Sequence, residues 1–357
     1  MTGIVNNKHK RVFVAMSGGV DSSVAALLLQ QQGYDVTGVY MKNWSDPLAD
    51  ECPWEQDAAD FLRVCKTIGI PHQIATFEDA YRAKVVEYLI KGYRAGLTPN
   101  PDMLCNREIK FKVFLKYALA HGANYIATGH YVRRSTRQNI VSLHAARDHT
   151  KDQSYFLALL TQAQAQRSLF PLGTLLKSEV RRIAKKNHLH VHDKKDSQGI
   201  CFIGKVKFKD FIRQFIPAKP GNIVMTNGTV IGKHEGLSIY TIGQRHGIGI
   251  GGGIPYYVVE KNIKKNELVV TPASDNKPLF QTRLVFKNSS WVEKIPNVPL
   301  VCQVRIRYRQ PLQKAKLRKK GNFYRLDFVQ KQRAVSPGQI AALYSRGRLL
   351  GGGIIVK

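Results

Sequence analysis

The chain has 357 residues, enough for two or three domains, and 43% of them are hydrophobic, so a sizeable core can form. No apolar run approaches the ~18 residues of a transmembrane helix, and the polar first residues lack a secretory signal, so we expect a cytoplasmic protein without a membrane span. Lys and Arg number 55 against 25 Asp and Glu, and this net charge of +30 indicates a polyanionic partner.

Apolar strands alternate with helical patterns in the first part of the chain. Strands are predicted at residues 12–16, 36–41, 72–77 and 125–129. Helices are predicted at residues 22–32, 57–68, 79–95, 107–121 and 177–187. Because the strands are almost wholly apolar and helices follow them, they predict an α/β fold with a doubly wound parallel sheet.

Short strand-like runs separated by Gly, Pro and Asn replace this pattern after about residue 205. They are predicted at residues 223–225, 256–259, 268–271, 283–286, 301–308, 323–328, 340–344 and 349–356. The first three predict a small central β domain, and the others a C-terminal β-barrel. The expected domains are residues 1–210, 211–275 and 276–357.

The expected barrel carries much of the positive charge. Residues 276–357 contain 18 Lys and Arg against only Glu293 and Asp327, a net charge of +16. Such a segment is expected to bind the phosphates of a nucleic acid, with Arg307, Arg309 and residues 314–320 as candidates.

A glycine turn joins the first predicted strand to the first predicted helix in VFVAMSGGVDSS, residues 12–23. Gly18 and Gly19 let successive backbone N–H groups converge on an anion, and the N-terminus of the following helix favours negative charge there. The kinase-type phosphate loop is absent, whereas SGGxDS resembles the signature of the PP-loop ATP pyrophosphatases. The alternative is an ordinary glycine turn with a serine cap.

Cys105 stands in a segment that favours a reactive thiol, TPNPDMLCNREIKFK at residues 98–112. The prolines predict an extended backbone and a helix that begins near residue 106 or 107. Cys105 is then at a helix N-terminus beside Arg107, where a thiolate is stabilised, and Asp102 is a candidate acid or base. The alternative is a buried structural cysteine with Asp102 as a helix cap.

Cys201 stands between two glycines in DSQGICFIG, residues 196–204. A thiol on a glycine-hinged loop can swing between partners. By this pattern alone, a small buried side chain beside Ile200 and Phe202 is an equal alternative.

Several motifs together resemble one family. PNPDxxCNxxIKF, SxGICFIG and SGGVDSS, with ATGHY, KDQSYFL, YTIGQRHGIGIGG, RYRQ and SPGQ, closely resemble the tRNA-specific 2-thiouridylases, the MnmA family of tRNA-uridine 2-sulfurtransferases. The resemblance runs from about residue 11 to the C-terminus, with no departure at a motif position.

The resemblance implies a role for each matching position. ATP would bind at Ala15, Met16, Ser17, Gly18, Gly19, Val20, Asp21, Ser22, Met41 and Gly129. The target base would face Asn100, Pro101 and Asp102. Cys105 would be the nucleophile, and Cys201 would carry sulfur as a persulfide. The tRNA would contact His130, Lys151, Asp152, Gln153, Arg307, Tyr308 and Gln339.

The implied reaction is ATP-dependent 2-thiolation of the wobble uridine, position 34, in the tRNAs for Lys, Glu and Gln. Adenylation of the C2 oxygen creates a leaving group, and the sulfur arrives either by direct persulfide attack or as hydrogen sulfide that Cys105 releases. Mg²⁺ is expected to compensate phosphate charge, and Asp21 would hold it or orient the loop. The implied partners are the anticodon stem-loop of tRNA and a persulfide-carrying donor protein. We expect a monomer that does not bind a membrane.

Two other interpretations are another PP-loop adenylating ligase or RNA-modifying enzyme, and a non-catalytic RNA-binding protein with a relic nucleotide fold. The paired cysteines and the basic barrel argue against the first. The intact glycine loop and both cysteines argue against the second.

Overall fold

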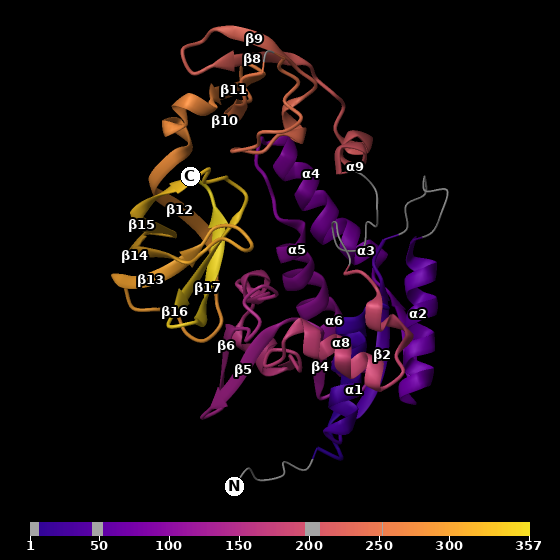
Figure 1. Ribbon diagram of the computed structural model, residues 1–357. Coiled ribbons are helices and arrows are strands. Elements are labelled where there is room, and N and C mark those ends of the chain that lie inside the picture. The colour runs from indigo at the N-terminus through magenta and orange to yellow at the C-terminus, as the bar shows by residue number, and fades with distance from the viewer. Residues whose placement is uncertain (1–6, 45–52, 197–207, 252) are drawn as a thin grey trace.

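Three β-sheets organise the chain, which the computed structural model describes at residues 7–44, 53–196, 208–251 and 253–357. Figure 1 shows the α/β part at the lower right, a small sheet at the top and a barrel on the left. The helices are α1 (Val20–Gln31), α2 (Pro53–Ile68), α3 (Glu78–Tyr81), α4 (Glu87–Arg94), α5 (Pro101–Leu104), α6 (Phe114–Ala120), α7 (Gln162–Gln166), α8 (Lys177–Lys186) and α9 (Phe208–Phe215), with π-helical segments η1 (Arg82–Val86) and η2 (Cys105–Val113). Short 3₁₀ turns are η3 (Ser154–Leu157), η4 (His190–Asp193), η5 (Leu237–Ile239), η6 (Ala273–Asp275) and η7 (Lys277–Leu279).

The N-terminal sheet is parallel and buried on both faces. It contains β1 (Arg11–Met16), β2 (Asp35–Lys42), β3 (His72–Thr76), β4 (Tyr125–Thr128) and β7 (Ser168–Leu169), in the order β3-β2-β1-β4-β7. Side chains of β1 alternate between the faces: Phe13 belongs to a core cluster with Phe114 of α6. Val14 belongs to another cluster, with Val24 of α1. The predicted doubly wound α/β sheet is therefore confirmed.

The helical run that carries Cys105 begins earlier than predicted, at Pro101. Asn100 caps it, because its side-chain oxygen accepts the N–H of Met103 at 3.1 Å. Proline suits the first position of a helix, where its missing N–H costs no hydrogen bond. The expectation of an extended backbone up to residue 106 or 107 was wrong, since Asn-Pro here starts a helix.

A hairpin within the N-terminal half extends the sheet of the barrel. Its strands, β5 (Val132–Arg137) and β6 (Ile140–Ala145), were not predicted from the sequence. β6 pairs antiparallel with β17, with Leu143 opposite Leu349, so the hairpin continues the C-terminal sheet. The α/β part and the barrel therefore share one sheet.

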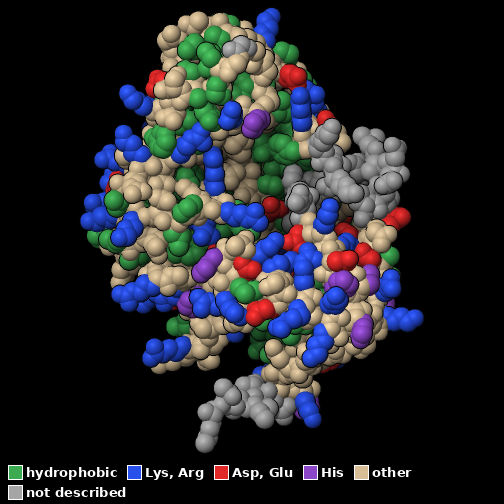
Figure 2. Space-filling view, viewed as in Figure 1, with side chains coloured by type: hydrophobic (Ala, Val, Ile, Leu, Met, Phe, Trp, Pro, Cys, Tyr) green, Lys and Arg blue, Asp and Glu red, His purple; other side chains and the backbone are tan. Residues whose placement is uncertain are grey.

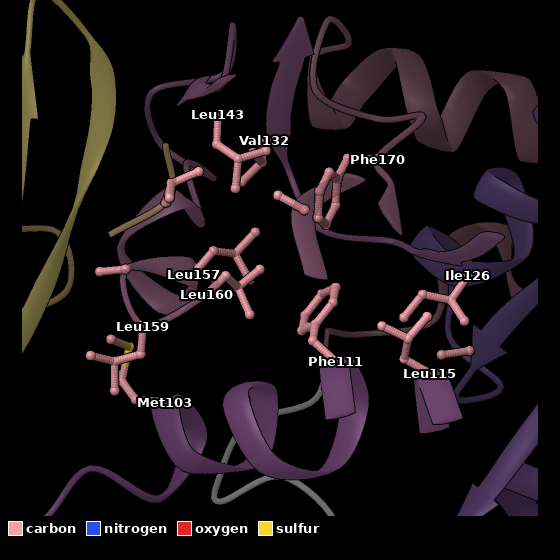
Figure 3. Packing of buried hydrophobic residues seen from close by; sticks show 14 of the residues in the cluster. Met103, Phe111, Leu115, Ile126, Val132, Leu143, Leu157, Leu159, Leu160 and Phe170 are labelled. Atoms are coloured by element: carbon pink, nitrogen blue, oxygen red, sulfur yellow. The ribbon is translucent and has the colours of Figure 1, made fainter. Parts of the chain in front are cut away.

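One hydrophobic cluster fills the space between the parallel sheet, the helical run and this hairpin (Figure 3). Met103 and Phe111 come from the helical run, Leu143 comes from the hairpin, and Leu157 and Leu160 lie between them. All five side chains are buried. The position of the Cys105 helix is thus set by packing against both halves of the molecule.

The central sheet is small and mixed. It contains β8 (Gly221–Met225), β9 (Val230–His234), β10 (Tyr256–Asn262) and β11 (Glu267–Pro272), in the order β10-β11-β8-β9. β8 and β11 pair in parallel, and the other pairs are antiparallel. Its own core includes Ile223, Val258 and Leu268.

The C-terminal strands close into an antiparallel barrel, as predicted. They are β12 (Phe280–Trp291), β13 (Leu300–Arg305), β14 (Gln313–Lys320), β15 (Phe323–Arg333), β16 (Ile340–Ser345) and β17 (Arg348–Ile355), and the pairing of β12 with β17 closes the ring. β14 was not predicted as a strand. Its lysines alternate with the buried Ala315 and Leu317, a period of two that the basic composition obscured.

No helix in the described ranges is both long and apolar enough to span a membrane.

Replacing Phe111 by alanine tests the shared core. Phe111 is fully buried, so Phe111→Ala is expected to lower the free energy of unfolding by about 3–5 kcal/mol. Urea denaturation followed by tryptophan fluorescence measures the change. Leu119→Ala is the control on the same helical run, because Leu119 is 40% exposed. Equal effects of the two substitutions would contradict the proposed role of this core.

Candidate active site

The glycine loop lies at the carboxyl end of β1. Gly18 has a φ of +68°, and a Cβ atom there would lie 2.2 Å from the carbonyl oxygen of Asp57 in α2. Gly19 precedes α1 in an extended conformation, and no side chain caps this helix. The first N–H groups of α1 therefore face outward without a side-chain acceptor, as an anion site requires.

The hydroxyls of Ser22 and Ser23 bind the backbone of the loop. Ser22 Oγ donates to the carbonyl of Gly19 at 3.2 Å and accepts the N–H of Ser17 at 3.2 Å. Ser23 Oγ also donates to Gly19, at 2.8 Å. These hydroxyls therefore shape the turn.

A second strand end closes on the glycine loop. Gly129 follows β4, and a Cβ atom at this position would lie 2.8 Å from both the carbonyl carbon of Asp21 and the nitrogen of Ser22. β1 and β4 are neighbours at the point where the strand order reverses, which is where ligands bind in open α/β sheets. Of the other positions assigned to ATP, those buried beside the loop are Ala15, Met16, Val20 and Met41.

Two lysines that the sequence analysis missed surround the loop. Lys177 Nζ lies 2.7 and 2.8 Å from the two carboxylate oxygens of Asp21, which also accepts the hydroxyl of Tyr131 at 2.8 Å. Lys194 Nζ donates to the carbonyl of Gly18 at 3.1 Å and to Asp57 at 2.8 Å. No motif marks either lysine, because each stands far from the loop in the sequence.

Charge compensation shifts the pKa values around Lys194. Burial alone would lower the pKa of Lys194, but its hydrogen bonds to Asp57 and Asp60 outweigh burial and raise it. Burial likewise would raise the pKa of Asp60, but its bonds with Lys194 and His190 hold that pKa below its ordinary value. These ion pairs fasten the N-terminus of α2 to the back of the glycine loop.

Cys105 is buried in the helical run and is not at its N-terminus. It is the first residue of the π-helical segment η2, and its N–H is bonded to carbonyls of the preceding turn. It packs in a cluster with Tyr81, Leu89 and Phe211. The expectation that free N-terminal amides stabilise its thiolate was wrong, because Asn100 and Pro101 occupy the helix start. π-Helical turns are frequent at functional sites.

Cys201 and the rest of its motif lie outside the described residues. Asp196 is the last described residue before them. Its carboxylate binds Lys151 Nζ at 2.6 Å and Lys177 Nζ at 2.7 Å. Asp196 therefore lies beside the glycine loop, because Lys177 also binds Asp21.

The residues assigned to the target base, 100–102, follow three residues that dock on the barrel, so that residues 97–102 lie against a turn at residues 336–339. We call these segments the base loop and the barrel turn. The N–H of Thr98 donates to the carbonyl of Pro337 at 2.8 Å, and Gln339 Nε2 donates to the carbonyl of Thr98 at 2.9 Å. Asn100 Nδ2 donates to Gln339 Oε1 at 3.4 Å. Residues assigned to the base and to the tRNA therefore meet here.

Gly338 makes this docking possible. It has a φ of +95°, and a Cβ atom there would lie within 2.9 Å of three backbone atoms of Thr98. On the other side, Lys261 of β10 donates to the carbonyls of Leu97 and Tyr240, at 3.2 and 3.0 Å. The base loop is thus held by both β parts of the chain.

Several residues assigned to tRNA have protein partners. Asp152 is 4% exposed and accepts the N–H groups of Ala146 and Ser154 and the guanidinium of Arg305. Gln153 Oε1 accepts the N–H of Tyr131 at 2.9 Å. These two side chains fix the connection between the parallel sheet and the barrel.

His130 is buried between aromatic rings. Its ring contacts those of Phe111 and Phe170, and its Nδ1 lies 2.7 Å from Thr128 Oγ1. Burial, with the nearby charge of Lys110, holds the pKa of His130 well below its usual value, so the ring is neutral at pH 7.

Arg307 and Tyr308 line the seam between the barrel and its neighbours. Arg307 donates to the carbonyls of Ile242 and Ala334, at 3.0 and 2.8 Å, and so ties the central part to the barrel. Tyr308 packs on Phe156, with ring centroids 4.5 Å apart.

An open hollow of about 420 Å³ lies beside this seam. Its lining residues are His149, Thr150, Lys151, Asp152, Arg305, Arg309, Gln310 and Pro311. Figure 2 shows Lys and Arg side chains spread over the barrel and across the junction below it. This distribution suits a polyanion.

Three family models match consecutive parts of the chain. They are the tRNA methyl transferase HUP domain at residues 10–205, the tRNA methyl transferase PRC-barrel domain at 209–272 and the aminomethyltransferase beta-barrel domain at 281–355. A tRNA-specific 2-thiouridylase MnmA of Streptococcus agalactiae is 48% identical over 99% of this chain and 96% of its own length. One of Pseudomonas syringae is 49% identical over 98% of this chain and 95% of its own.

The chain belongs to the tRNA-specific 2-thiouridylase (MnmA) family. The resemblance seen in the sequence motifs is thereby confirmed. A solved U34-tRNA thiolase of Methanococcus maripaludis is 18% identical over 59% of this chain and 65% of its own, with a TM-score of 0.36.

Gly129→Ala tests the closure of the glycine loop in this 2-thiouridylase family member. The added methyl group overlaps the first turn of α1, so the affinity for a non-hydrolysable ATP analogue is expected to fall at least about tenfold, as measured by calorimetry. Gly251→Ala is the matched control, because a Cβ atom there meets nothing within 4 Å. Unchanged affinity of the Gly129 variant would exclude this arrangement.

The contribution of Lys261, which donates a hydrogen bond to the base loop, depends on pH. Burial lowers the pKa of Lys261 to about 8, from the ordinary 10.5. Between these values the unfolded chain binds a proton that the folded protein does not, so this lysine's contribution to stability rises with pH. In thermal unfolding, the melting temperature of the wild type relative to that of Lys261→Met should rise from pH 8 to 10.5. The exposed Lys264→Met serves as control, and a pH-independent difference for Lys261→Met would refute the assignment.

Proposed function

We propose that the protein transfers sulfur to C2 of the wobble uridine, position 34, of the tRNAs for Lys, Glu and Gln, with cleavage of ATP to AMP and pyrophosphate. Membership of the tRNA-specific 2-thiouridylase family supports the reaction class. The observation that carries the site assignment is the hydrogen bond of Asn100 with Gln339, which joins the base loop to the basic barrel.

The glycine loop activates the base. The C2 carbonyl of uracil is a poor electrophile without a leaving group, and attack of its oxygen on the α-phosphate of ATP supplies one. The pyrophosphate released in this step is stabilised by the N–H groups at residues 18–22, where negative charge is favoured. Asp102, in the first turn of the helical run, is the candidate acid or base for this step.

Two thiols deliver the sulfur. The terminal sulfur of a Cys201 persulfide attacks C2, and AMP leaves. Cys105 then attacks Cys201 Sγ, the electron pair of the broken S–S bond forms the thiocarbonyl, and a Cys105–Cys201 disulfide remains for a cellular reductant to open. In the alternative route, Cys105 first releases hydrogen sulfide from the persulfide, and hydrogen sulfide attacks C2.

The described glycine loop is suited to the phosphates of ATP. The described residues around it offer no site for Mg²⁺. Both oxygens of Asp21 face Lys177, and within the described ranges no group of three or more His, Cys, Asp or Glu can hold a metal ion. Mg²⁺ would accompany ATP through its phosphates.

We assign residues 1–210 to ATP binding and catalysis, 211–275 to a central β domain and 276–357 to tRNA binding. The three separate sheets support this division, although the hairpin β5–β6 joins the last of them. Arg309 and the lysines of β14 are the candidates for phosphate contacts. A persulfide-carrying donor protein, a cytoplasmic location and a monomeric state complete the proposal.

Removing either thiol tests the sulfur transfer. Cys105→Ala and Cys201→Ala are each expected to abolish 2-thiouridine formation in a single-turnover assay, while tRNA binding persists. Cys302→Ala is the control, because Cys302 lies in the barrel core, where burial raises the pKa of its thiol to about 12. Normal turnover by the Cys201 variant would refute the relay, and a disulfide between residues 105 and 201 after turnover without reductant would support direct attack.

A further inference from the structure

Lys177 bridges the glycine loop and Asp196. Its ammonium contacts both oxygens of Asp21 and lies 2.7 Å from Asp196 Oδ1, and its side chain is only 12% exposed. Lys177 is the first residue of α8, and its N–H donates to Asp148 Oδ2 at 2.9 Å. The lysine is thus fixed both at its backbone and at its charged end.

Asp21 needs such a cation. It lies in the first turn of α1, beside the N–H groups that face the anion site. A carboxylate suits the positive end of a helix, but it repels a phosphate that binds the same N–H groups. An unpaired Asp21 would therefore oppose the binding that the glycine loop favours.

Further charged side chains complete the network. Asp196 also binds Lys151 at 2.6 Å and Arg181 at 3.4 Å. Three carboxylates, those of Asp21, Asp148 and Asp196, thus lie among three cations. The cations balance the negative charge beside the loop without a metal ion.

The same contacts argue against Asp21 as a metal ligand. Mg²⁺ requires an octahedral set of oxygens at about 2.0–2.1 Å. Both oxygens of Asp21 already face an ammonium, and one also accepts the hydroxyl of Tyr131.

We propose that Lys177 is a positioning residue of the phosphate site, which neutralises Asp21 and holds it off the anion, and that Asp21 does not ligate a metal. The inference rests on the proposed binding of ATP at the glycine loop. It resolves the two roles that the sequence left open for Asp21 in favour of loop orientation.

Calorimetric titration of the full chain with pyrophosphate, a non-hydrolysable ATP analogue and AMP tests the proposal. Lys177→Met is expected to weaken the first two ligands at least about tenfold and AMP less than threefold, because AMP leaves the pyrophosphate part of the site empty. Lys177→Arg should restore most of the affinity. Lys185→Met, on the exposed side of the same helix, should leave all three affinities unchanged.

Removing the charges of both Asp21 and Lys177 shows whether Lys177 acts by neutralising Asp21 or by contacting the phosphate directly. The double variant Asp21→Asn/Lys177→Met lacks the repelling carboxylate, so its affinity for pyrophosphate is expected to return to within about threefold of wild type. It also carries the test if Lys177→Met alone fails to fold, because it leaves no buried unpaired charge. Asp21→Asn alone should not change the Mg²⁺ concentration that half-saturates binding of the ATP analogue.

Three results would overturn the proposal: pyrophosphate affinity that is unchanged in Lys177→Met, a double variant as weak as the single one, or a raised Mg²⁺ requirement in Asp21→Asn. Wild type that binds neither pyrophosphate nor the ATP analogue would instead refute the proposed function, and this inference with it.

Discussion

The docking of the base loop on the barrel turn is the contact on which the rest of the site depends. A backbone hydrogen bond from Thr98 to Pro337 and the close approach of Gly338 fix the chain just before the helical run begins. Asn100 then caps that run and also binds Gln339. The position of Cys105, five residues further along, follows from this anchor and from the core around Phe111. A shift of the barrel would therefore move the helix that carries the thiol.

The two halves of the site differ in how they are stabilised. The glycine loop depends on close backbone approach at Gly18 and Gly129 and on partly buried ion pairs with Lys177 and Lys194. The base loop depends on hydrogen bonds between its own backbone and two β-rich parts of the chain, which supply a backbone carbonyl and the side chains of Gln339 and Lys261. Asp152, Gln153 and Arg307 are engaged by protein groups. We therefore propose that they shape the seam between the barrel and its neighbours, and that exposed cations, not these three residues, contact the phosphates.

The parallel sheet, the glycine loop and the barrel could be predicted from the sequence because their signals are local. Apolar strands, a Gly-Gly turn before a helix and closely spaced short strands each reflect the backbone of a few residues. The start of the Cys105 helix was mispredicted because Asn-Pro suits both an extended segment and a helix cap, and tertiary contacts of Asn100 decide between them. The hairpin at β5 and β6 was missed because β5, VRRSTR, is mostly polar and exposed, and because β17, which pairs with β6, lies about two hundred residues later in the chain.

The charge network was beyond prediction for the same reason. Lys177 is 156 positions from Asp21, and nothing in its local sequence distinguishes it from the other lysines of α8. Only the fold brings the start of α8 to the first turn of α1. The cysteine motifs, by contrast, could be recognised because each is a continuous stretch of residues that resembles the family's motif. Cys201 itself lies outside the described residues.

The most direct test of the account is mass spectrometry of nucleosides from tRNA incubated with the purified protein, ATP and a persulfide donor. The account predicts 2-thiouridine at the wobble position, formed only when ATP is present and accompanied by an equal amount of AMP. Thiolation without ATP, thiolation at another position, or AMP formation without any thiolated nucleoside would contradict it.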